Sequence, residues 1–166
     1  MTLQTSLLIF FLGTISNSFG QLTLQKMCQQ VLTENKIGKP YSYDKSNKAN
    51  GHDETILTYL GSVNSHDGRI FKVLTYEYIW GPNYHTSGSI YIFNEKNKYV
   101  GQYQLSDARY LPVKLQDGNL IFTNVDNESC DKNLVTTISL NKGLPKNIFI
   151  KCKGVYGDLY SFSSDD

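Results

Sequence analysis

The chain lacks the short motifs that identify the common classes of enzyme. It contains no Gly-x-Ser-x-Gly nucleophile motif, no His-Glu-x-x-His zinc motif and no Gly-x-x-x-x-Gly-Lys-Ser/Thr phosphate loop. It also lacks a Cys-x-x-Cys pair, so neither a zinc ribbon nor a thioredoxin-like site is predicted. A hydrolase remains an alternative only if its site is assembled from residues distant in sequence, such as the carboxylates of Glu77 and Asp107, which no motif pairs.

A basic patch and a long internal apolar segment are missing as well. The formal net charge is +1, and the lysines are scattered among acidic residues. Because a non-specific nucleic-acid binder normally carries a basic face, the composition argues against nucleic acid as a partner. Beyond residue 20 no segment approaches the roughly 18 consecutive apolar residues that cross a bilayer as a helix, so no transmembrane segment is predicted in the mature chain.

One apolar run is present, at the N-terminus. Residues 7–12 read LLIFFL, and small or polar residues follow, with Ser18 and Gly20 at the −3 and −1 positions of a cut before Gln21. This run has the length of a signal-peptide apolar region and is too short for a hydrocarbon core of ~30 Å. The pattern predicts a cleavable secretory signal over 1–20 and one exported domain over 21–166, periplasmic or extracellular, although the segment before the run carries no Lys or Arg.

The chain has three cysteines, Cys28, Cys130 and Cys152. Export permits a disulfide. Cys130 and Cys152 flank a predicted hairpin, so a bond between them is expected, while pairing of Cys28 with either one stays open as an alternative. Cys28 falls on an apolar helical stripe, which favours a packed thiol over the nucleophile of a Cys–His dyad.

The N-terminal part of the mature chain predicts a helix followed by a loop. Leu24, Met27, Cys28 and Val31 occupy positions i, i+3, i+4 and i+7, the spacing of one helix face. This pattern predicts a short helix over 22–34. Residues 36–53 are polar and contain Gly, Pro and Asn, so an exposed loop is predicted there.

From residue 54 onward, short segments rich in β-branched and aromatic residues alternate with Gly, Asn and Asp. Such closely spaced segments predict antiparallel hairpins, because the connections are too short for parallel crossovers. The expected fold is mainly β: one antiparallel meander of about eight strands, forming a curled sheet, a sandwich or a small barrel, with the short N-terminal helix. The predicted strands are 54–61, 69–80, 87–94, 99–105, 119–124, 134–140, 147–152 and 155–162.

The histidines offer a weak candidate for a metal site. His52 and His66 each precede an aspartate, and a carboxylate can orient an imidazole. His66 lies in the predicted turn at the far end of the first strand, so it cannot join the other two. His52, Asp53 and His85 can meet at the near end, although the favoured interpretation is that they are surface residues with turn preferences.

The segment 76–85 (YEYIWGPNYH) is unusually aromatic for one strand and its turn. Aromatic side chains at a strand end, beside a rigid Gly-Pro turn, can form a binding patch. The favoured interpretation is that Trp80 and its neighbours close one end of a barrel or sandwich by packing, because a core Trp is common where it can pack. The candidate patch consists of Tyr76, Tyr78, Trp80, Tyr84 and His85.

The sequence therefore favours a small exported, non-enzymatic binding protein for a macromolecule or a surface component. Its partner is an unidentified protein, glycan or small ligand, and no cofactor is predicted. A small-ligand carrier with a cavity inside a curled sheet or barrel is the alternative. The sequon at Asn127, followed by Glu128 and Ser129, predicts glycosylation if the chain passes through a eukaryotic secretory pathway.

Overall fold

A computed structural model describes residues 16–49, 51–124 and 130–164. Residues 1–15, which include most of the predicted signal, and the predicted sequon at Asn127 lie outside this part of the chain. Among the described residues, no helix is both long enough and apolar enough to cross a membrane. The elements are α1 (Ser16–Glu34), β1 (Pro40–Asp44), β2 (His52–Asn64), β3 (Ile70–Gly81), β4 (His85–Asn94), β5 (Tyr99–Leu105), the 3-10 helix η1 (Ala108–Tyr110), β6 (Lys114–Gln116), β7 (Asn119–Thr123), β8 (Val135–Ser139), β9 (Asn147–Lys153) and β10 (Tyr156–Ser163).

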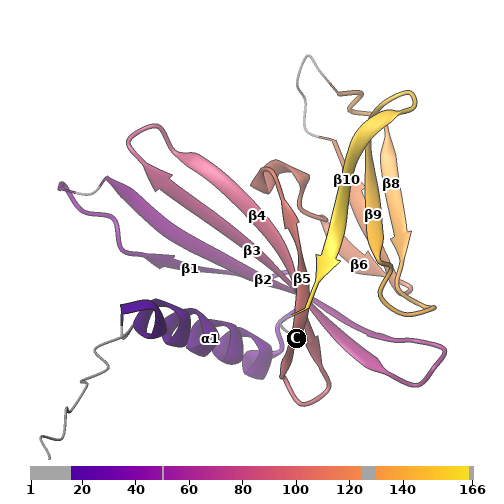
Figure 1. The fold of residues 1–166 in the computed structure, drawn as a ribbon, viewed down its shortest axis with the longest axis horizontal. Helices are drawn as coiled ribbons and strands as arrows, with labels where there is room; N and C mark the ends of the chain where they lie inside the picture. Colours follow the sequence, from indigo (N-terminus) through magenta and orange to yellow (C-terminus); the bar gives the residue numbers. More distant parts are fainter. Residues whose placement is uncertain (1–15, 50, 125–129, 165–166) are drawn as a thin grey trace, which may run out of the picture.

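The strands form two antiparallel sheets, which confirms the predicted mainly β class and the short N-terminal helix. The larger sheet has the order β1-β2-β3-β4-β5-β10-β9, and the smaller one has the order β6-β7-β8. Strands β2 to β5 follow the predicted meander, β1 adds to its edge, and β10 takes the place beside β5 (Figure 1). No ladder joins the two sheets in the described residues, so the curled assembly remains open.

The predicted loop over 36–53 is wrong in its middle, because β1 lies there and pairs with β2 from Pro40 to Asp44. The sequence pattern did not indicate this strand, because its proline and the polar residues around it are typical of a loop. Proline is tolerated at the sheet edge that β1 occupies, and only Tyr41 and Tyr43 of this strand are half-buried. Helix α1 also begins at Ser16 and not at residue 22, so it runs through the predicted cleavage position before Gln21. The apolar stripe starts only at Leu24, so periodicity gave no sign of the earlier turns.

The β1–β5 region has two faces with different partners. One face turns toward the smaller sheet and the β9–β10 hairpin, and a core of interdigitating side chains fills the space between them, including Val73, Ile90, Tyr103, Leu120 and Ile148. We call this the inner face. The other face is covered in part by α1, whose Cys28, Val31 and Leu32 pack on Leu57 and Leu74. We call it the helix-side face. Successive residues of a strand alternate between the two.

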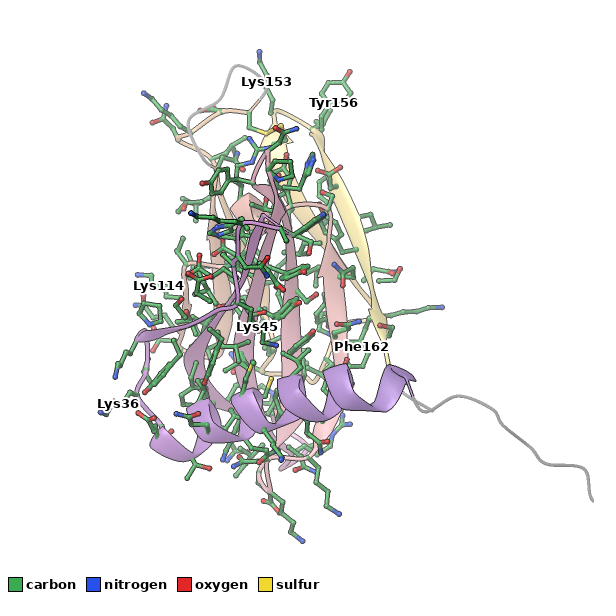
Figure 2. The ribbon with its side chains drawn as sticks, turned by 90° about the vertical axis from the view of Figure 1, so that its left-hand side faces the viewer. Lys36, Lys45, Lys114, Lys153, Tyr156 and Phe162 are labelled. Carbon is green, nitrogen blue, oxygen red and sulfur yellow. A yellow bond between two sulfur atoms is a disulfide. The ribbon has the colours of Figure 1, made fainter. Side chains whose placement is uncertain are left out.

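The predicted disulfide is present. Cys130 and Cys152 are bonded, with a Cα–Cα distance of 4.5 Å, and the bond ties the segment before β8 to β9 where the two sheets adjoin. Backbone N–H groups reinforce this seam: Asp131 N donates to Cys152 O at 2.7 Å, and Lys151 N donates to Thr136 Oγ1 at 3.0 Å. Lys153 and Tyr156 project from the β9–β10 end of the molecule, away from α1 (Figure 2).

Candidate ligand-binding face

Six ring-bearing side chains form a continuous row on the helix-side face. The ring centroids of neighbours in the row are 5.2–6.4 Å apart, and the rings from Trp80 to Tyr91 lie within 20° of parallel. The row is exposed at His85 and Trp80 (36% accessible to solvent) at one end and at Tyr99 (37%) at the other, and its middle is half-buried. We call it the aromatic row; in order it contains His85, Trp80, Tyr78, Tyr76, Tyr91 and Tyr99.

Strand alternation and register place the row. Tyr76, Tyr78 and Trp80 are two residues apart on β3, so all three point to the same face. His85 opens β4 directly opposite Trp80. Tyr91 on β4 is opposite Leu74, which is two residues from Tyr76 on β3. The contact between Tyr76 and Tyr91 is therefore diagonal across the two strands, as cross-strand aromatic contacts can be.

Polar side chains on neighbouring positions hold three of the tyrosine hydroxyls. The Tyr76 hydroxyl interacts with Thr55 on β2, and the Tyr78 hydroxyl interacts with the Asp53 carboxylate. Burial, and then the charge of Asp53, raise the pKa of Tyr78 above its usual value. Burial likewise raises the pKa of Tyr91, whose hydroxyl interacts with Ser89. The tyrosine rings and Trp80 also stack on one another, so a ligand meets side chains that are already oriented.

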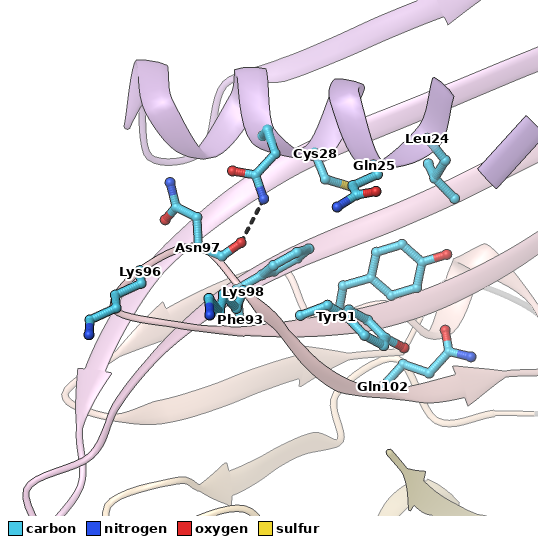
Figure 3. A pocket seen from close by; sticks show the side chains of 11 residues that line it. Leu24, Gln25, Cys28, Tyr91, Phe93, Lys96, Asn97, Lys98 and Gln102 are labelled. Carbon is cyan, nitrogen blue, oxygen red and sulfur yellow. Dashed lines mark hydrogen bonds between the residues drawn. The ribbon is translucent and has the colours of Figure 1, made fainter. Parts of the chain in front are cut away.

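The row ends in a cleft between α1 and the β4–β5 hairpin. Its volume is about 550 Å³, within the range of small-ligand sites. One wall is apolar, with Leu24 and Phe93 beside Tyr91, and the rim carries amides and two lysines, Lys96 and Lys98 (Figure 3). The helix is fastened over this cleft by Gln29, whose Nε2 donates to Asn97 O at 2.6 Å. The Lys72 ammonium donates to Asn97 Oδ1 at 2.6 Å, which fixes the same turn.

The structure brings four of the five predicted patch residues together and separates the fifth. Tyr84 lies in the turn after β3 with a φ of 53°, and its ring contacts His52 at 4.8 Å. It lines a second cleft, of about 420 Å³, with the loop between β1 and β2. Tyr84 was included in the candidate patch because it is close to Trp80 in sequence. The turn that begins at Gly81 reverses the chain between them and separates their side chains.

The three candidate metal ligands do not converge. His52 lies on the inner face, where its Nε2 is 3.1 Å from Glu54 Oε2 and its Nδ1 is 3.3 Å from Ser46 Oγ. Asp53 and His85 lie on the helix-side face, on opposite sides of Trp80. No group of three or more potential metal-binding side chains occurs within the residues that the structure covers. The prediction that the three residues lie at one end of the sheet is correct. It did not take into account which face of the sheet each side chain points to.

Carboxylates meet on the inner face, at the end of β2 and β3. Burial raises the pKa of Glu77, and the nearby charges of Glu54 and Asp107 raise it further. The structure thus brings Glu77 and Asp107 into the same neighbourhood. They point away from the aromatic row, however, because Glu77 alternates with Tyr76 and Tyr78 along β3. A ligand on the row therefore cannot reach these carboxylates.

Cys28 is packed as predicted. It is 3% exposed, and burial raises the pKa of its thiol to about 12. A thiol that stays protonated at neutral pH is a poor nucleophile.

The cleft residues beyond the predicted patch were missed from the sequence. Tyr91 and Tyr99 stood in predicted strands, but only the register shows that they extend the row from Tyr76. Gln29 and Gln102 are ordinary polar positions of a helix and a strand. Comparison of the chain with protein-family models, with curated proteins and with solved structures gives no match, so the geometry alone identifies this face as the candidate site.

Proposed function

We propose that the protein is a small exported binding protein that holds its ligand on the helix-side face, along the aromatic row. The observation that carries this proposal is the row itself: oriented, partly exposed rings on the face opposite a core already filled by side chains. Tyr76 and Tyr91 also pack against the core beneath α1, whereas Trp80 and Tyr99 are exposed, and exposed aromatic side chains supply contact area at low entropic cost. Their exposure favours the binding patch over the alternative in which Trp80 closes one end of the fold.

Two features favour a binder over an enzyme. The carboxylates Glu54, Glu77 and Asp107 lie on the opposite face from the rings, and the only free cysteine in the described residues is a buried thiol of raised pKa. A carrier with an internal cavity is also less favoured. The inner face is occupied by the core, and the 550 Å³ cleft lies outside it, beneath α1.

Export is the second part of the proposal. The disulfide between Cys130 and Cys152 is a bond that persists in oxidising compartments, which supports export of a chain that begins with a signal-like apolar run. Intact mass measurement of the protein secreted by its own host tests this part. A chain of residues 21–166 with two hydrogens lost is expected, whereas a full-length reduced chain would contradict it.

The single tryptophan makes the binding face directly observable, because Trp80 belongs to the row. Protein labelled with fluorotryptophan gives one fluorine resonance, which can be followed while unlabelled polysaccharide, lipid and protein fractions of the host envelope are added. We expect a saturable shift with one fraction. Tyr78→Ala should weaken it by about tenfold or more, as central aromatic contacts commonly do.

Tyr156→Ala is the matched control. It removes a tyrosine that is 76% exposed, on the β9–β10 hairpin and outside the row. The response to the active fraction should be unchanged in this variant. If no fraction shifts the Trp80 resonance, or if Tyr78→Ala and Tyr156→Ala behave alike, the helix-side face is not the binding site and the proposal fails.

A further inference from the structure

The cleft beneath α1 differs in chemistry between its two ends. Lys96 and Lys98 lie at one end, on either side of Asn97 in the turn between β4 and β5 (Figure 3). Leu24 and Tyr91 lie toward the other end. Among the described residues that line the cleft there is no aspartate or glutamate. A ligand that fills the cleft therefore meets positive charge at one end and apolar side chains at the other.

The positive charge at the basic end is not neutralised by neighbouring carboxylates. Lys72 is half-buried on β3, and its ammonium group donates to the neutral Asn97 Oδ1 at 2.6 Å. In the described part of the chain none of Lys72, Lys96 and Lys98 takes part in a salt bridge. Glu95, the acidic residue of the same turn, is exposed and does not line the cleft. Three cations gathered in this way stabilise an anion that binds beside them.

The apolar end offers contact area without requiring an open aromatic face. Leu24 of α1 and Tyr91 of β4 are half-buried, and Tyr99 of β5 is 37% exposed. An apolar group that binds here needs only van der Waals contact with these side chains, because the gain from burial follows the area removed from water. No ring face has to be free for stacking.

The dimensions of the cleft favour a small molecule. Its volume of about 550 Å³ is in the range of small-ligand sites. The walls are also fixed relative to each other, since Gln29 Nε2 of α1 donates to Asn97 O of the turn at 2.6 Å. A site whose walls are already held in place loses less conformational freedom when a ligand binds.

We propose that the cleft beneath α1 is a binding site for a small organic anion. The anionic group lies beside Lys96 and Lys98, and an apolar body lies against Leu24 and Tyr91. The observation that carries the proposal is the combination, in one cleft, of lysines without carboxylate partners and an apolar wall. It goes beyond the proposed function, because it gives the cleft a ligand of its own and does not require the exposed Trp80 at the other end of the aromatic row.

Isothermal titration calorimetry of the whole protein tests the class of ligand with defined probes. Decanoate carries a carboxylate on a flexible chain, and 2-naphthoate carries one on a rigid ring system. Decyltrimethylammonium has the chain of decanoate with a cation, and acetate has a carboxylate without an apolar body. Decanoate, 2-naphthoate or both should bind saturably, and the preferred one identifies the ligand as lipid-like or aromatic. The cation and acetate should not bind; binding of the cation as tight as that of decanoate, or no binding by any probe, would overturn the inference.

Lysine variants test the place of binding. The double variant Lys96→Gln/Lys98→Gln should raise the Kd of the bound probe by about tenfold, which is the effect of losing a charge-assisted hydrogen bond. Lys151→Gln/Lys153→Gln is the matched control, because it removes the same charge from exposed positions of β9, outside the cleft. The control should leave the Kd unchanged. If the two double variants behave alike, the anion does not bind at the cleft and the inference fails.

Amide resonances of labelled protein give an independent map. Those of Gln25, Gln29 and Asn97 should shift as the probe is added, whereas shifts centred on other parts of the molecule would contradict the inference. Thermal melting followed by circular dichroism keeps loss of fold from being read as loss of binding. If every probe fails while a host fraction still shifts the Trp80 fluorine resonance, only the inference is lost. If the probes bind and Trp80 responds to no fraction, only the proposed function is lost.

Discussion

Removing the disulfide should destabilise the protein by an amount that its position allows us to estimate. Cys130 and Cys152 are 22 positions apart. In the chain-entropy model, releasing a loop of that length lowers the free energy of unfolding by ~3 kcal/mol. A domain of this size is stabilised by only ~5–15 kcal/mol in total, so the melting temperature should fall by roughly 10 °C. The double variant Cys130→Ser/Cys152→Ser tests this without leaving a new free thiol.

The assay is urea unfolding followed by Trp80 fluorescence, for the wild type, the double variant and the wild type after reduction. The double variant and the reduced wild type should agree. Hydrogen exchange should increase most at the seam, at the amides of Asp131 and Lys151, which donate across it. A loss below ~1 kcal/mol, or exchange that rises equally in α1, would refute the reasoning that the bond stabilises by tying the two sheets at that seam.

Three further predictions follow from single positions. Cys28 should resist a thiol reagent at pH 8 until the protein is unfolded, because a pKa of about 12 leaves about one molecule in ten thousand as thiolate. Gly88→Ala should lower the free energy of unfolding by ~1–3 kcal/mol in urea titrations, since its Cβ would lie 3.0 Å from Ala108 Cα and Leu111 Cγ. Glu77→Gln should raise the melting temperature at pH 7 but not at pH 3: the folded-state pKa of Glu77 is raised, so its ionisation opposes folding at neutral pH, and that penalty disappears once the carboxyl is protonated in both states.

Local pattern predicted most strands because hairpins are encoded locally. Residues 99–105 were assigned as a strand with the bounds that β5 has, and the disulfide followed from cysteines flanking a hairpin. β1 and β6 were missed for a physical reason. Each is short, and an edge strand such as β1 needs few apolar residues because only one of its sides is paired.

The alternation of side chains along a strand predicts only the part of the candidate site that lies on a single strand. Tyr76, Tyr78 and Trp80 share a face by their spacing alone, and the sequence did indicate them. The continuation of the row through Tyr91 and Tyr99 depends on the register between strands. The choice of the face that α1 covers depends on helix packing. Both are set by long-range contacts that no local window contains.

The junction between β5 and β10 bears on the order in which the fold is completed. Only two residue pairs join these strands, Phe162 with Tyr103 and Ser163 with Gln102, yet they connect the meander to the β9–β10 hairpin. The meander β1–β5 can assemble from neighbours as the chain emerges, whereas the inner core cannot be enclosed until β10 has emerged. Until then, the apolar side chains on the inner surface of the meander, including Ile90 and Tyr103, are exposed and can promote aggregation. The late docking of β10 is the step that buries them.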